Sequence, residues 1–118
     1  MSTPEGLVKR AIMGYLSVIA NCEVFPISTI GVYDASQNRY RKSTMRAGTP
    51  DLLLCYKGIF IGIEVKSKTG RLSDSQIEIG LCIESSGGIW GVAKSLDDVR
   101  AILNRADLRL THTLTDVK

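Results

Sequence analysis

The fold is decided between residues 50 and 66, which read PDLLLCYKGIFIGIEVK. Two runs rich in aliphatic, aromatic and β-branched residues, 52–56 and 59–67, are separated only by the dipeptide Lys57-Gly58. Strands joined by two residues, with glycine available where φ must be positive, are typical of a tight β-hairpin. The stretch therefore predicts two adjacent antiparallel strands.

The register of this hairpin brings charged side chains together. If the loop consists of two residues alone, Asp51 lies directly opposite Glu64 in the ladder. Alternation along the second strand places Lys66 on the same face as Glu64. The opposite face is apolar throughout and suits a core: Leu52, Leu54, Tyr56, Ile59, Ile61, Ile63 and Val65.

Two carboxylates and an ammonium at one end of a hairpin suit a divalent cation site. Mg²⁺ and Mn²⁺ prefer oxygen ligands, and Mg²⁺ usually takes only one or two protein carboxylates. Such an ion stabilises charge on a phosphodiester and lowers the pKa of a bound water. Lys66 would orient or help deprotonate that water. A surface ion-pair network is the structural alternative for the same three residues.

The segments before the hairpin predict a helix, a strand and a long loop. Thr3 as N-cap and Pro4 at the first helical position open a helix over residues 4–20. A strand over 22–33 follows, and a polar loop over 34–49 precedes the hairpin. Loops longer than about 12–15 residues in a small domain are usually functional or disordered. We expect this one to be functional.

The segments after the hairpin predict helices against a sheet. A capping-box pattern at Ser73 and Gln76 opens a helix that continues through Ile83, is apolar nearly all round, and should be well buried. A strand over 89–93 leads into a last helix, and the tail after about residue 105 has no clear periodicity. The order α-β-β-β-α-β-α predicts an α/β fold with a small mixed β-sheet flanked by helices.

Composition indicates one ordinary globular domain, residues 1–118. The chain is too short for two domains of usual size, and 44% hydrophobic with 23% charged residues excludes a disordered or fibrous chain. No apolar run reaches the roughly 18–20 residues that cross a bilayer, and no signal peptide opens the chain, so a cytoplasmic location is expected. The cysteines lack a CxxC pair, which predicts buried free thiols at Cys22, Cys55 and Cys82.

The basic residues are concentrated in one part of the chain. The net charge is only +3, but residues 34–71 carry eight basic against three acidic residues, which leaves the remainder net negative. Such asymmetry suggests a surface that meets a polyanion, although a solvated charged surface is the alternative. The candidates for phosphate contacts are Arg39, Arg41, Lys42, Arg46, Lys68 and Arg71.

Three motifs in this order resemble a known nuclease superfamily. They are GTPD at residues 48–51, EVK at residues 64–66, and GRLSDSQ at residues 70–76. The set resembles the PD-(D/E)xK nucleases and, among them, is most similar to the virus-type replication-repair nuclease domain (VRR-NUC), particularly its small stand-alone phage and bacterial members. The resemblance covers most of the chain. It implies a restriction-endonuclease-like core and metal-dependent hydrolysis of DNA.

The resemblance also implies roles for individual residues. Asp51 and Glu64 correspond to the metal ligands of the superfamily, and Lys66 to its catalytic lysine. The backbone carbonyl of Val65 commonly completes the coordination in such sites. The implied cofactor is Mg²⁺ or Mn²⁺.

Two further residues have both a structural and a functional interpretation. Glu5 suits the positive end of the first helix, yet its place on the helix points its carboxylate along the apolar stripe. The superfamily often has an acidic residue near the metal on this helix, so Glu5 is a further candidate ligand. Gln76 either caps its helix or, as in related nucleases, lies beside the lysine. We expect its side chain to serve one role at a time.

The resemblance implies an endonuclease that is selective for branched DNA such as Holliday junctions. Stand-alone members of the family look like homodimers, and a two-fold dimer sets two active sites against two strands. The alternatives are a restriction-like or exonucleolytic nuclease with the same chemistry, and a non-catalytic DNA-binding module. The intact Asp51, Glu64 and Lys66 favour an enzyme over a module that has lost its site.

Overall fold

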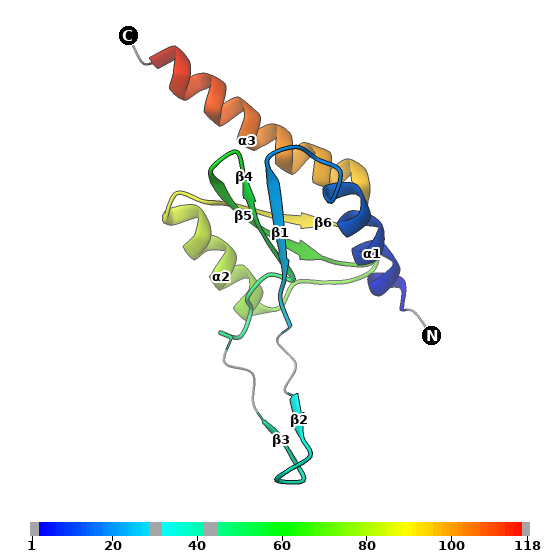
Figure 1. Ribbon diagram of the computed structural model, residues 1–118. Coiled ribbons are helices and arrows are strands. Elements are labelled where there is room, and N and C mark those ends of the chain that lie inside the picture. The colour runs from blue at the N-terminus through cyan, green and yellow to red at the C-terminus, as the bar shows by residue number, and fades with distance from the viewer. Residues whose placement is uncertain (1–2, 29–31, 42–44, 117–118) are drawn as a thin grey trace.

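A four-stranded mixed sheet forms the centre of the molecule (Figure 1). The computed structural model describes residues 3–28, 32–41 and 45–116. The strand order is β1-β4-β5-β6, with β6 parallel to β5 and the other pairs antiparallel. The strands are β1 (Cys22–Pro26), β4 (Leu52–Tyr56), β5 (Ile59–Val65) and β6 (Ile89–Ala93).

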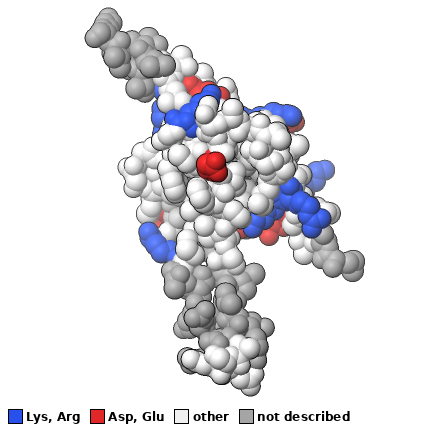
Figure 2. All heavy atoms as spheres, in the orientation of Figure 1, with Lys and Arg blue, Asp and Glu red and all other residues white. Residues whose placement is uncertain are grey.

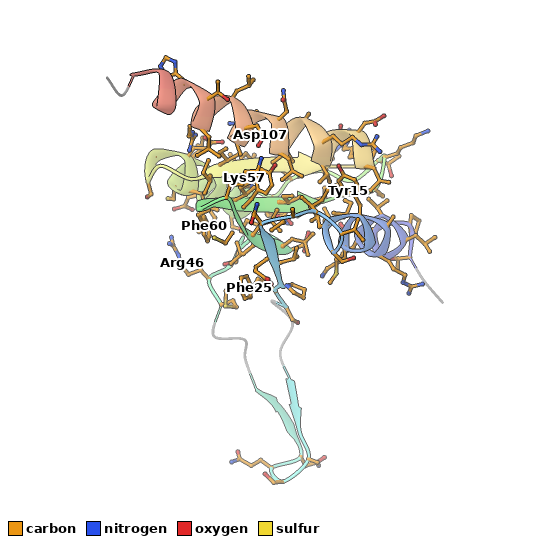
Figure 3. The ribbon with its side chains drawn as sticks, turned by 45° about the horizontal axis from the view of Figure 1, so that its top comes forward. Tyr15, Phe25, Arg46, Lys57, Phe60 and Asp107 are labelled. Atoms are coloured by element: carbon orange, nitrogen blue, oxygen red, sulfur yellow. The ribbon has the colours of Figure 1, made fainter. Side chains whose placement is uncertain are left out.

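The predicted hairpin and its register are confirmed. β4 and β5 pair from Tyr56 with Ile59 to Leu52 with Ile63. Lys57 and Gly58 form the loop with φ of 51° and 83°, as a two-residue turn with both central residues at positive φ requires. The Lys57 ammonium reaches across to the Asp107 carboxylate at 2.9 Å, which ties the loop to the last helix (Figure 3).

The apolar face of the hairpin lies in the core, as predicted. Two helices cover it, α1 (Pro4–Leu16) and α3 (Leu96–Asp116). Both contribute fully buried side chains, such as Ile12 from α1 and Val99 from α3. The sheet residues of this core are Leu52, Leu54, Tyr56, Ile61, Ile63, Val65, Ile89 and Ala93.

The third helix, α2 (Asp74–Ser85), packs on the other face of the sheet, over β5 and β6. The predicted capping box at its start is present. The expectation of a well-buried helix is wrong, because Leu81 is 61% exposed and the helix buries only Ile79 and Gly80. This helix has the sheet on one side and no further layer on the other, so its remaining apolar residues face outward.

Replacing Gly80 by alanine is expected to destabilise the protein. The ring of Trp90 on β6 lies so close that an added Cβ would come within 2.2 Å of it, so the indole or α2 must shift to admit a methyl group. Such overpacking costs about 1–3 kcal/mol in the free energy of unfolding, measured by denaturant titration. Gly14→Ala is the matched control, because nothing lies within 4 Å of its Cβ, and it should stabilise α1 by about 0.5–1 kcal/mol. Equal effects of both substitutions would contradict this packing.

The main-sheet order α-β-β-β-α-β-α is confirmed, with one addition that the sequence did not predict. A small hairpin of β2 (Val32–Asp34) and β3 (Arg39–Arg41) is inserted between β1 and β4 and lies away from the main sheet (Figure 1). The expected strand over 22–33 ends at Pro26, since proline lacks the N–H needed to continue a ladder. The expected loop over 34–49 therefore contains a strand.

Both terminal helices differ from their predicted lengths. α1 ends at Leu16 rather than residue 20, because the chain turns before β1 with Asn21 at a φ of 59°. α3 begins at the predicted Ser95 cap, where the Ser95 hydroxyl accepts the Asp98 N–H at 3.2 Å. It continues to Asp116, so the tail after residue 105 is helical.

The three cysteines are free, but only Cys22 is partly buried. The prediction of buried thiols is wrong for Cys55 and Cys82, which are exposed. Cys55 alternates with buried Leu54 and Tyr56 and therefore points to the face of the sheet that lies outside the core. In the described ranges, no helix has both the length and the apolar character to cross a membrane.

Candidate active site

Asp51 is held in place by both neighbouring strands. It directly precedes β4, where the paired ladder with β5 ends. Its Oδ2 accepts the backbone N–H of Val65 at 2.8 Å, and its carbonyl oxygen accepts the N–H of Ile27, just after β1, at 2.8 Å. The carboxylate is thus fixed next to the end of β5, where Glu64 lies.

Glu64 is a buried carboxyl group, with only 1% of the residue exposed. Its Oε1 accepts the side-chain N–H of Gln76 at 3.0 Å, whereas its Oε2 is buried with no hydrogen-bond partner in the described part of the chain. Burial, then a hydrogen bond that the protonated carboxyl makes with Asp51 and the negative charge of Asp51, raise the pKa of Glu64 to about 8, and Lys66 opposes this shift. The site is therefore short of positive charge.

Gln76 caps α2 and contacts Glu64 at the same time, so the expectation that its side chain serves one partner at a time is wrong. Its Oε1 accepts the backbone N–H of Ser73 at 2.8 Å, which completes the capping box. Its Nε2 donates to Glu64 in the same conformation. A carboxamide has an acceptor at one end of its head group and donors at the other, so the helix cap itself aims the donor at Glu64.

Glu5 reaches the same site from α1. A hollow of about 230 Å³ lies between α1, the end of β1 and the end of β5, and its lining residues are Thr3, Glu5, Gly6, Lys9, Ile27, Ser28, Asp51 and Val65. Glu5 is also close enough to contribute to the raised pKa of Glu64. Glu5 thus shares the hollow with Asp51, and the charges of Glu5 and Lys66 both act on Glu64.

Lys9 is a site residue that the sequence reasoning missed. It lines the hollow that Asp51 and Glu5 also line, and it forms no ion pair with a described carboxylate. Its spacing of one helical turn from Glu5 was the available signal, because residues four apart share a helix face. The hollow therefore has an ammonium as well as carboxylates on its wall.

The residues predicted to contact phosphates lie in different parts of the molecule. Lys68 and Arg71 are exposed in the segment between β5 and α2, next to the site. Arg46 lines a different hollow, together with Phe60 and Cys82. Arg39 and Arg41 lie on β3, which is described by its backbone only, and Lys42 lies outside the described residues.

The residues present fit a small divalent cation. The donors are hard oxygens, and Oε2 of Glu64 is buried beside the Asp51 carboxylate, so the ionised form of Glu64 lacks a compensating cation among the described residues. No group of three or more Asp, Glu, His or Cys side chains is gathered as a ligand set within the described ranges. Within that part of the chain, Asp51 and Glu64 are two carboxylates close to each other, and Mg²⁺ usually takes only one or two carboxylates from a protein.

Comparison with known proteins identifies the architecture. No family model matches the sequence. No curated protein matches it either. A solved structure described as a "VRR_NUC domain" superposes with a TM-score of 0.65 over 87% of this chain and 97% of that chain, at 20% sequence identity. The chain has the fold of a VRR-NUC domain, as the sequence motifs predict.

Proposed function

We propose that this protein is a metal-dependent deoxyribonuclease that hydrolyses phosphodiester bonds in DNA. The observation that carries the proposal is the pairing of Asp51 with a buried Glu64 at the end of one hairpin, with no cation in the described part of the chain compensating the two carboxylates. The likeness in fold to a VRR-NUC domain supports the proposal. A surface ion-pair network would not bury Glu64.

Asp51, Glu64 and the carbonyl of Val65 would hold Mg²⁺ or Mn²⁺, with Glu5 as a further ligand. When bound, such an ion neutralises charge on the phosphodiester and lowers the pKa of a water molecule. Gln76 fixes the Glu64 carboxylate by its hydrogen bond, and the N–H of Val65 fixes that of Asp51. The ligands are thus oriented before substrate arrives.

Lys66 is the residue proposed to act on the attacking water. It follows β5 directly, and its backbone N–H is anchored to the Ala93 carbonyl at 3.0 Å, which fixes the start of its side chain. Its ammonium orients the water, whose oxygen bonds to phosphorus as the P–O3′ bond breaks. The attacking water loses a proton to solvent, the 3′ oxygen takes one up, and the products are a 5′ phosphate and a 3′ hydroxyl.

The proposed substrate is branched DNA, such as a Holliday junction, cut by a homodimer. A two-fold dimer presents two identical sites to two strands. The proposed phosphate contacts are Arg39, Arg41, Lys42, Lys68 and Arg71. We omit Arg46 from this set because it lines a hollow among apolar side chains.

The direct test compares a four-way junction, a flap and a linear duplex, each with Mg²⁺, Mn²⁺ or EDTA. The proposal expects metal-dependent cleavage, fastest on the junction. Preference for the duplex or its ends would favour the restriction-like or exonucleolytic alternative. Cleavage that persists in EDTA, or binding without cleavage in any metal, would contradict the proposed activity.

Replacing Arg41 and Lys42 together by alanine is expected to weaken DNA binding and flatten its salt dependence. Each neutralised phosphate releases counterions, so the slope of log affinity against log salt becomes shallower by about 0.9 for each phosphate that the variant no longer neutralises. Arg100→Ala with Arg109→Ala makes the same charge change at exposed positions of α3 and should leave the slope unchanged. Equal slopes for both double variants would remove β3 from the DNA interface.

A further inference from the structure

The sheet has an uncovered apolar face outside the core. Cross-strand pairing aligns Glu23, Cys55 and Phe60 in one row, and Phe25 with Leu53 in the next. Phe25 is 56% and Phe60 49% exposed. Single exposed apolar residues are ordinary, but a contiguous set on one face marks an interaction surface.

A hollow continues this face toward α2. It has a volume of about 330 Å³, and its lining residues are Arg46, Phe60, Ile79, Cys82, Ile83, Ser86 and Gly88. Phe60 belongs to both the row and the hollow, so the two form one surface, which we call the outer apolar face. Figure 2 shows this side of the molecule as a broad uncharged surface with isolated acidic and basic groups.

The face carries a charge of each sign on opposite borders. Glu23 lies on the edge strand β1, and Arg46 lies at the hollow beside α2. Neither forms an ion pair with another described residue. Phe25 projects from the β1 side, whereas the hollow lies on the side of Phe60 and Arg46 (Figure 3). One border thus has a projecting aromatic ring and an acidic group, and the other has a hollow and a basic group.

We propose that a second copy of this chain docks on the outer apolar face with two-fold symmetry. An isologous contact exchanges the two borders, so Phe25 of each copy meets the hollow of the other and Glu23 meets Arg46. DNA does not suit this face, because it is uncharged over most of its area. The inference rests on the homodimer included in the proposed function and assigns the surface that forms it.

Phe25→Glu tests the apolar part of this contact, with dimerisation followed by sedimentation over a range of concentrations. We expect a dimer in the natural chain and a dimer dissociation constant raised at least about 30-fold in the variant, as for a central aromatic residue. Leu108→Glu introduces the same charge at a 61% exposed residue of α3 and should leave the dimer unchanged. A natural chain that stays monomeric, or equal effects of both variants, would overturn the proposal. Cooperative thermal unfolding of each variant establishes that it is folded.

A charge swap tests the symmetry. Arg46→Glu should weaken the dimer about tenfold, since it sets two acids against each other, and adding Glu23→Arg should restore the affinity of the natural chain. Additive losses in the double variant would overturn the predicted pairing. Because neither residue is exchanged for an apolar one, folding of both variants is expected.

The two proposals fail in different ways. A chain that dimerises through Phe25 but never cuts DNA supports the interface and contradicts the nuclease. A chain that cuts a junction while remaining monomeric supports the nuclease and contradicts the interface. Cys55 gives a second readout, because it is exposed in one copy and covered in the dimer. Its alkylation by N-ethylmaleimide should slow with rising concentration of the natural chain and not of Phe25→Glu; equal rates would count against the interface.

Discussion

Replacing Asp51 by asparagine is expected to reduce metal-dependent DNA cleavage by about 1,000-fold. The substitution removes one of the two carboxylates proposed as the main metal ligands, and the charge stabilisation that a bound divalent ion supplies is worth several kcal/mol. Single-turnover cleavage of the preferred DNA, with Mg²⁺ or Mn²⁺ in excess, measures the loss. A variant that cuts within a few-fold of the natural rate would remove Asp51 from the chemistry.

The fold of this variant should be intact, which makes the result interpretable. Asparagine keeps a carbonyl oxygen that can accept the Val65 N–H, now accepted by Oδ2 of Asp51 at 2.8 Å. Lys66→Met complements it by removing the ammonium without changing the carboxylates, and it should cost about 10²–10⁴-fold. Lys94→Met, at an exposed lysine on another segment, is the control. Unequal losses in the first two variants separate metal holding by Asp51 from orientation of the water by Lys66.

The sequence sufficed for the hairpin because that element is specified locally. Loop length, the glycine in the loop and period-two alternation between Asp51 and Lys66 determine one register, and a slip by one residue would invert both faces. The same register placed Asp51 near Glu64. The capping box was equally local, and so Gln76 was found from its spacing alone.

Features that depend on packing between distant parts of the chain were harder to predict from the sequence. The burial of α2 depends on how much of the sheet it covers, so its apolar sequence overstated the burial of residues such as Leu81. The inserted hairpin was hidden because β2 and β3 have three residues each, too few for a reliable periodicity. Helix α3 continues past residue 105 partly through contacts with the β4–β5 loop, such as that of Asp107 with Lys57.

The residues of the candidate site also fall into those that local sequence predicts and those that depend on distant packing. Asp51, Glu64 and Lys66 follow from one hairpin, whereas Lys9 enters only because α1 packs against the end of β1. The position of Glu5 on its helix could be predicted from the sequence, but its distance from the hairpin could not. The two simultaneous contacts of Gln76 could not be predicted from the sequence. They depend on Glu64 lying within hydrogen-bond distance of the Gln76 NH2 group, which is the end of the amide that does not cap α2.

Replacing Glu64 by glutamine is expected to stabilise the metal-free protein at alkaline pH. The pKa of Glu64 is about 8 in the folded chain, well above the ordinary value of 4.5 for an exposed carboxyl. Between these values the folded state binds more protons than the unfolded state, so stability falls as pH rises. The loss at this one group is on the order of 3–5 kcal/mol once pH exceeds 8.

Glutamine is neutral throughout this range, so the variant should lack that pH dependence. In EDTA, the two proteins should have similar free energies of unfolding below pH 4.5, and the variant should exceed the natural chain by a few kcal/mol above pH 8. Its carbonyl oxygen can still accept from Gln76, and its amide N–H faces the neighbouring Asp51 as a donor. Denaturant titration at several pH values measures the difference.

The same linkage makes metal binding a second readout of the site. A divalent cation favours the ionised carboxylate, so Mg²⁺ or Mn²⁺ should raise the melting temperature of the natural chain more at pH 8 than at pH 5. The metal should raise the melting temperature of Glu64→Gln much less. Glu78→Gln changes an exposed carboxylate of α2, and its melting temperature should respond to metal as that of the natural chain does. A natural chain whose stability is flat between pH 5 and 8, with or without metal, would mean that Glu64 is not held as a buried, partnerless acid. The energy stored in that ionised group is what a cation at this site would recover.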